Sequence, residues 1–119
     1  PPEIQRALGR AHMLYVEGNV TDAATILSDV VVQCSSIPEP YALLALIFND
    51  VGKHREALQF YKLASTREPR KLGHHREVAR IAGILGDHES RLEALKLLAR
   101  LQPTNLNVAI DRARCLLDL

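Results

Sequence analysis

The feature that most constrains this chain is a repeat of 34 residues. Glycine stands at Gly18, Gly52 and Gly86, each separated from the next by this interval. Alanine and proline keep the same register, at Ala11, Ala45, Ala79, Ala113, Pro69 and Pro103. A fixed period of this length is typical of folds in which one small unit is stacked many times. Three classes of residue in one frame therefore predict a chain built from a single repeated unit.

The second repeat, residues 38–71, shows the unit most completely. Its residues provide in order a large residue, Leu, a small residue, an aromatic residue, Gly, Ala, an aromatic residue, Ala and Pro. They are Tyr41, Leu44, Ala45, Phe48, Gly52, Ala57, Tyr61, Ala64 and Pro69. On these residues the chain resembles the tetratricopeptide-repeat (TPR) family. The resemblance implies an all-α, right-handed α-solenoid of helical hairpins.

The other repeats match the pattern with some departures. Repeats are expected over residues 4–37, 38–71 and 72–105, followed by a terminal helix over 106–119. The first repeat has Ser35 in place of the closing proline. In the third, His75 replaces the opening large residue and Arg91 replaces the small alanine of the second helix. We predict one TPR array over residues 1–119, with about three and a half hairpins.

Local residue types predict where each helix begins and ends. Small side chains at Ala45 and Ala57 let two helix axes approach, and larger ones would cost roughly 1–3 kcal/mol through overpacking. Gly52 follows a helical stretch, where a left-handed cap favours glycine. Pro69 stops the second helix. Helices are expected over residues 3–17, 20–34, 38–51, 54–67, 72–85, 88–101 and 105–118.

Composition narrows the classes of function. The formal net charge is +1, far from the basic balance of a dedicated nucleic-acid binder. Cys34 and Cys115 stand apart without a CxxC pairing, which favours free thiols in a reducing compartment. There is no signal-peptide pattern and no apolar run near the roughly 18 residues that span a bilayer. We therefore expect an intracellular protein, and we interpret a start at Pro1 without Met as part of a longer chain.

No residue pattern points to catalysis. Cys34, the pair Ser35–Ser36 and the scattered histidines form no recognisable nucleophile–base arrangement. His74 and His75 are adjacent, and adjacent residues of a helix point apart, which disfavours a metal site. The basic stretch 67–80 is interpreted as a solvated junction between repeats in preference to a phosphate site. We predict no enzymatic activity, no metal, no cofactor and no small-molecule ligand.

The TPR resemblance implies that the first helix of each hairpin lines a concave groove. The predicted protein-binding residues are His12, Tyr15, Leu43, Leu46, Asn49, Arg76, Arg80 and Arg114. The leucines predict an apolar end and the arginines a basic row, which suits a partner segment with hydrophobic anchors and an acidic flank. The alternative is a solvated charged face beside a leucine pair that flanking repeats cover.

One common TPR ligand is not expected. Chaperone adaptors of the family hold a terminal carboxylate pair with lysine, asparagine and arginine at defined groove positions. This chain has Leu8, His12, Leu43, Gly73 and Glu77 at those positions. Binding to the acidic tails of heat-shock chaperones is therefore disfavoured.

Repeats one to three also resemble a narrower group, the amino-terminal TPR region of the TPR subunit of transcription factor IIIC. The matches are Leu8, Gly9, Ala11, Tyr15, Gly18, Leu44, Ala45, Ile47, Ala57, Leu58, Gln59, Phe60, Leu63, Ala64 and Pro69, and at the next junction Pro103, Thr104, Asn105 and Arg112. Of these, Gln59, Phe60 and Leu63 extend beyond the general TPR positions. The third repeat departs, because that group has a tryptophan near its start and this chain has none.

This narrower resemblance implies a nuclear scaffold for RNA polymerase III transcription. Such a subunit holds the promoter-binding complex together and presents its groove to components of transcription factor IIIB. Neither direct sequence-specific reading of DNA nor a membrane partner is expected. Two alternatives stay open: a scaffold or adaptor of another multiprotein complex, and a regulatory TPR segment of a larger enzyme.

Overall fold

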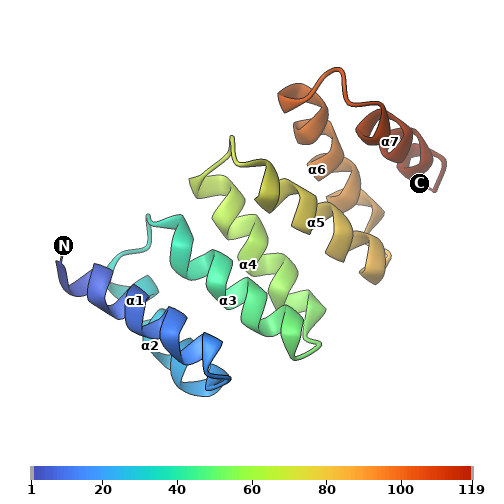
Figure 1. Cartoon of the computed structure of the whole chain (residues 1–119). Helices are drawn as coiled ribbons and strands as arrows, with labels where there is room; N and C mark the ends of the chain where they lie inside the picture. The colour runs from blue at the N-terminus through green and yellow to red at the C-terminus, as the bar shows by residue number, and fades with distance from the viewer. Residues whose placement is uncertain (1, 119) are drawn as a thin grey trace.

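The computed structural model describes residues 2–118, which form seven α-helices (Figure 1). The helices are α1 (Pro2–Val16), α2 (Val20–Gln33), α3 (Pro38–Asp50), α4 (His54–Arg67), α5 (Leu72–Leu85), α6 (His88–Leu101) and α7 (Leu106–Asp118). Every predicted boundary lies within one residue of the observed one. The sequence prediction of seven helical segments is confirmed over the described residues.

Consecutive helices pack against each other along the whole array. Figure 1 shows the hairpins α1–α2, α3–α4 and α5–α6 following one another in a row, with the two ends of the chain at opposite ends of the row. The principal extents are 45 × 27 × 21 Å and the radius of gyration is 15.4 Å. A compact domain of this length would have a radius of gyration of about 13.5 Å. The chain is thus an elongated, all-α solenoid.

Glycine ends the first helix of each complete hairpin. The backbone φ angles are +84° at Gly18, +82° at Gly52 and +73° at Gly86. This left-handed conformation costs little for glycine and more for any residue with a Cβ. At the Gly52 turn, Lys53 N also donates a backbone hydrogen bond to Phe48 O at 2.8 Å. The turn therefore satisfies a carbonyl that the helix end would leave unpaired.

The core runs between the helices in three adjoining clusters. Ala11, Ala45 and Ala57 are fully buried, as the small-residue pattern predicts. Phe48 of α3 and Phe60 of α4 stack with ring centroids 5.4 Å apart, and both pack against the first and second clusters. The two stacked rings therefore connect the first hydrophobic cluster to the second.

The first junction has Ser35 in place of the closing proline and is held by hydrogen bonds to the Ser35 carbonyl. Ser35 O accepts from Tyr41 Oη at 3.0 Å and from Arg67 Nε at 2.5 Å. The Arg67 guanidinium also lies over the Tyr41 ring, 4.3 Å from its centroid. These contacts tie the turn after α2 to the start of α3 and the end of α4. They replace the conformational stop that proline provides at the next junction.

The junction before α5 differs from the solvated segment that the sequence predicts. His74 and His75 are only 4% and 2% exposed. His74 Nε2 lies 2.9 Å from Glu68 Oε1, and His75 Nε2 donates to Pro69 O at 2.6 Å. The prediction was wrong for these two residues because each imidazole has a hydrogen-bond partner in the preceding turn, which offsets the cost of burial.

Candidate functional site

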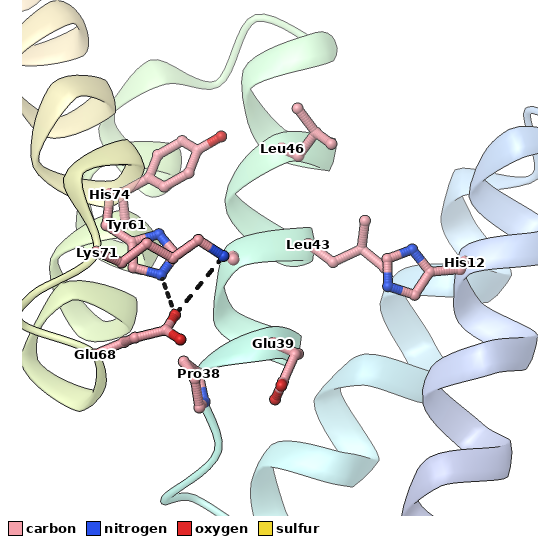
Figure 2. Close-up of a pocket in the computed structure, with 10 residues that line it drawn as sticks. His12, Pro38, Glu39, Leu43, Leu46, Tyr61, Glu68, Lys71 and His74 are labelled. Atoms are coloured by element: carbon pink, nitrogen blue, oxygen red, sulfur yellow. Dashed lines mark hydrogen bonds and ion pairs between the residues drawn. The ribbon is translucent and has the colours of Figure 1, made fainter.

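A first cleft opens between α3 and α5, with α4 behind it. Its volume is about 320 Å³, and Figure 2 shows the residues that line it. They are His12, Pro38, Glu39, Ala42, Leu43, Leu46, Tyr61, Glu68, Lys71 and His74. We call this the apolar cleft, because Ala42, Leu43 and Leu46 of α3 line its central wall, with Glu39 of the same helix nearer the start of α3.

The wall of the apolar cleft combines core residues with exposed ones. Leu43 is only 5% exposed and reaches from α3 toward His12 of α1 (Figure 2). Leu46 is half-buried, so it offers more apolar surface to a ligand. Tyr61 projects from α4 and is 6% exposed. The cleft thus presents an apolar surface supported by the core beneath it.

A polar group lies at one edge of the apolar cleft. Glu68 Oε1 is 2.9 Å from His74 Nε2 and 3.8 Å from Lys71 Nζ, as the dashed lines of Figure 2 mark. The lysine is more than half exposed, whereas the histidine side chain is 6% exposed. This edge is held in place by the buried imidazole, and its exposed charges can contact a ligand backbone or side chain.

The phenol of Tyr61 in this cleft has a raised pKa. Burial raises the pKa of Tyr61 to about 12, and the nearby Glu77 carboxylate adds to the effect. Both influences disfavour the phenolate, because it would be poorly solvated and close to another negative charge. The phenol therefore stays protonated at neutral pH, as an amphipathic surface that can donate a hydrogen bond.

A second cleft lies between α5 and α7, with α6 behind it, and has a volume of about 460 Å³. Its lining residues are Arg76, Ala79, Arg80, Gly83, Arg91, Leu95, Leu98, Asn105, Asn107, Val108 and Asp111. We call this the basic cleft. One repeat further along the chain, Arg76 takes the place of Ala42, and Arg80 takes the place of Leu46. The same groove positions thus change from apolar to cationic.

The arginines of the basic cleft differ in their partners. Arg80 donates to Glu77 Oε2 through Nη2 at 2.7 Å and through Nε at 3.1 Å, and this bond raises the pKa of Arg80. Arg76 Nη2 donates only to the neutral amide oxygen of Gln102, at 3.3 Å. Arg91 Nη1 is 3.7 Å from Asp118 Oδ2, too far for a good hydrogen bond. Two of these cations therefore lack a closely bound carboxylate within the described residues.

Some of the predicted groove residues line a cleft in the structure and others do not. Five of the eight line a cleft: His12, Leu43 and Leu46 in the apolar cleft, Arg76 and Arg80 in the basic cleft. The other three are Tyr15, Asn49 and Arg114, which lie outside the lining of both clefts.

Each of the three remaining residues has a different setting. Tyr15 is half-buried and hydrogen-bonded to Asp50. Asn49 is also half-buried, and its Oδ1 has no hydrogen-bond partner among residues 2–118. Arg114 is exposed on α7. The predicted row of three arginines is therefore reduced to two on the cleft wall.

Sequence reasoning missed the lining residues that come from second helices. Tyr61 of α4 lines the apolar cleft, and Arg91 and Leu95 of α6 line the basic cleft. Tyr61 and Leu95 are one period apart, so the repeat already carries the signal. For Arg91, the sequence showed only that it replaces the small alanine of the second helix. That departure does not show where the arginine side chain lies.

Two properties of the described residues concern metal binding and membrane crossing. Within residues 2–118, His, Cys, Asp and Glu side chains do not gather in threes at distances suited to a metal ion. Over the same range, no helix has both the length and the apolar character that crossing a bilayer requires.

Comparison with known proteins places the fold. No family model and no curated protein sequence match the chain. Among solved structures, the type III secretion chaperone SycD of Yersinia enterocolitica, in complex with a peptide of the translocator YopD, has a TM-score of 0.79 and 14% identity. The match covers 98% of this chain and 95% of the SycD chain in that structure.

Two other structures agree. The TPR domain of Arabidopsis OM64 has a TM-score of 0.73 and 11% identity, covering 96% of this chain and 94% of that domain. A chain of the Naa15/Naa10 complex bound to HypK has a TM-score of 0.84 and 15% identity, and covers 88% of this chain. The matched part is 16% of that longer chain. The fold of this chain is thus a TPR-type solenoid.

Proposed function

We propose that this chain is a protein-interaction scaffold that binds an extended segment of a partner across the two clefts. The observation that carries the proposal is the change at equivalent positions, from Ala42 and Leu46 in one repeat to Arg76 and Arg80 in the next. A segment that contacts both clefts satisfies them with an apolar side chain at one end and acidic side chains at the other. The SycD complex supports the proposal, because that structurally similar protein holds a peptide.

The apolar cleft provides the site for the apolar anchor side chain of the partner segment. Leu46 is half-buried, and Tyr61 and Leu43 beside it are already packed in the core. A ligand side chain entering here buries its apolar surface without requiring these residues to be ordered first. Binding to a preformed surface costs less conformational entropy than binding to a flexible one.

Peptide selection on the immobilised chain tests the scaffold proposal. We expect a random peptide library to yield sequences with an apolar anchor, whose affinity falls at least about tenfold in Leu46→Arg. The matched control is Leu63→Arg, since Leu63 is 38% exposed on α4 and lines neither cleft. A selection without enriched sequences, or peptides that bind Leu46→Arg as tightly as the wild type, would overturn the proposal.

We further propose that the scaffold is the TPR subunit of transcription factor IIIC and that its groove binds a component of transcription factor IIIB in the nucleus. What supports this is the match at Gln59, Phe60 and Leu63 on α4. Phe60 stacks on Phe48 between two parts of the core, which explains why an aromatic residue stands at this position. The net charge of +1 suits a subunit that leaves DNA reading to others.

Charge reversal tests this narrower assignment. Converting Arg76, Arg80 and Arg114 to glutamate should weaken the pull-down of a transcription factor IIIB subunit, while circular dichroism shows an intact fold. The single variant Arg114→Glu should have little effect, because this residue lies outside the lining of both clefts. Full binding by a correctly folded triple variant would contradict the assignment.

A further inference from the structure

Arg91 stands where the other complete hairpins have a fully buried alanine. The equivalent residues, Ala23 and Ala57, are 0% exposed, so this position normally lies in the packed contact between helices. Arginine is far larger and carries a charge that is costly to bury without a partner. The third hairpin must therefore provide both space and a polar environment for this side chain.

Gly83 of α5 provides the space. A Cβ atom at Gly83 would lie 3.7 Å from Arg91 Cδ and 3.9 Å from its Nε. The equivalent positions in the earlier hairpins hold Tyr15 and Asn49, whose side chains would occupy this volume. The pairing of a large residue at 91 with glycine at 83 lets the arginine stem pass beside α5 and reach the basic cleft.

The charge of Arg91 is incompletely balanced in the described chain. Its side chain is 22% exposed, and its carboxylate neighbour Asp118 is 3.7 Å away and 53% exposed. The cleft lining contains two more arginines and a single acidic residue, Asp111. Arg91 is partly buried, whereas Arg76 and Arg80 are exposed. A lining with three arginines and one acidic residue is complementary to an anionic ligand.

We propose that Arg91, together with Arg76, binds aspartate or glutamate side chains of the segment held in the groove and so determines its specificity. The inference rests on the proposed function, since it names the chemistry of that segment in the basic cleft. Arg76 reaches the cleft from α5 and Arg91 from α6, so the two guanidinium groups approach a carboxylate from different helices. Arg80 is already bonded to Glu77 and contributes less.

The experiment uses a peptide from the library selection and a copy in which each Asp and Glu is replaced by Asn or Gln. We expect Arg91→Met, which keeps the apolar stem, to lower the affinity for the acidic peptide about tenfold or more. The copy should bind the wild type and the variant equally weakly. The matched control is Arg100→Met, because Arg100 is exposed on the same helix and lines neither cleft.

A second variant separates ligand binding from a purely structural ion pair. If Arg91 served only to pair with Asp118, Asp118→Asn would reproduce the loss seen in Arg91→Met. We expect Asp118→Asn to bind the acidic peptide as tightly as the wild type or more tightly, because it removes a competing carboxylate. Thermal unfolding of each variant shows whether the array stays folded.

The outcomes distinguish this inference from the broader proposal. Peptides that depend on Leu46 but bind equally well to Arg91→Met, or as amide copies, would overturn the role of Arg91 and leave the groove proposal intact. Loss of binding in Asp118→Asn would also overturn it. A library without any Leu46-dependent peptide would overturn the proposed function and this inference together.

Discussion

Tyr15 Oη donates a hydrogen bond to Asp50 Oδ2 at 2.5 Å and so links α1 to α3, the first helices of successive hairpins. Both residues lie near the C-terminal ends of their helices. The bond raises the pKa of Tyr15, because the carboxylate stabilises the protonated phenol. This bond connects the two hairpins across their first helices.

Removing this bond should destabilise the array slightly. We expect Tyr15→Phe to lower the free energy of unfolding by roughly 0.5–1 kcal/mol, at the lower end for a bond to a charged group because Asp50 is exposed. Urea denaturation of Tyr15→Phe, Asp50→Ala and the double variant measures the coupling between the residues. Strictly additive effects of the two substitutions would show that the bond contributes nothing.

Two glycines should respond in opposite directions to alanine. Gly52 has φ +82°, so Gly52→Ala should lower the free energy of unfolding by about 1–2 kcal/mol through left-handed backbone strain. Gly9 lies inside α1, and apart from the backbone of its own helix no described atom lies within 4 Å of a Cβ built on it. Gly9→Ala should therefore raise stability by roughly 0.5–1 kcal/mol, because alanine is the better helix former.

Thermal denaturation of the two glycine variants checks this prediction. The same substitution is made in both, so a difference in sign isolates the backbone conformation as the cause. A loss of stability in Gly9→Ala, or a gain in Gly52→Ala, would contradict it.

Asp87 should stabilise the start of α6 in a pH-dependent way. Its Oδ1 accepts from Ser90 N at 3.1 Å and its Oδ2 accepts from Ser90 Oγ at 2.6 Å. The bond from the Ser90 hydroxyl has the larger effect and the bond from the Ser90 backbone the smaller, and together they hold the pKa of Asp87 below its usual value. We expect Asp87→Ala to cost about 1 kcal/mol at neutral pH, as the loss of an N-terminal cap does.

The pH dependence of this cap has a definite sign. The pKa of Asp87 is lower in the folded chain than in the unfolded one, so its contribution is complete above the unfolded value of about 3.9. It is lost as the pH falls through the lower, folded value. Wild type and Asp87→Ala should therefore converge in stability in acid, whereas the control Asp29→Ala, an exposed residue of α2, should show no such cap effect at neutral pH.

Tyr61 should titrate late and destabilise the fold at high pH. Its pKa of about 12 exceeds the ordinary value of 10.0, mainly through burial. The contribution of the neutral phenol is complete below pH 10.0 and is lost as the pH rises toward 12. Ultraviolet absorbance of tyrosinate should show a late component that is reduced in Tyr61→Phe, where Tyr15 still carries a raised pKa. If Tyr61→Phe instead lost absorbance change near pH 10.0 and kept the late component unchanged, the prediction would be contradicted.

Much of the fold follows from local residue patterns. The 34-residue period placed each helix boundary within one residue of the structure, because Gly52 and its equivalents mark turns through backbone conformation alone. Such turns depend on a few neighbouring residues, which sequence displays directly. The same period predicted the burial of Ala11 and Ala45, whereas the equivalent Ala79 is half-buried and Ala113 on α7 is exposed, because burial also depends on the helices that pack around each position.

The candidate site was predicted only in part. Leu46 and Arg80 were identified because equivalent first-helix positions face a cleft in successive repeats. Arg114 occupies the same register, yet α7 meets the basic cleft through Asn107, Val108 and Asp111, nearer its N-terminal end. Register alone therefore does not show which residues line a cleft, because a residue does so only where neighbouring helices leave that cleft open.

The repeat frame, the helices and their turns were determined by the order of residues, since each depends on short-range preferences that recur every 34 positions. The tertiary structure decided which side chains meet in the clefts. His74 is buried because Glu68 lies within hydrogen-bonding distance, and Arg91 reaches the basic cleft because Gly83, on a neighbouring helix, leaves room for its stem. Such contacts depend on the shape and polarity of the facing surface, which becomes defined only when the helices pack.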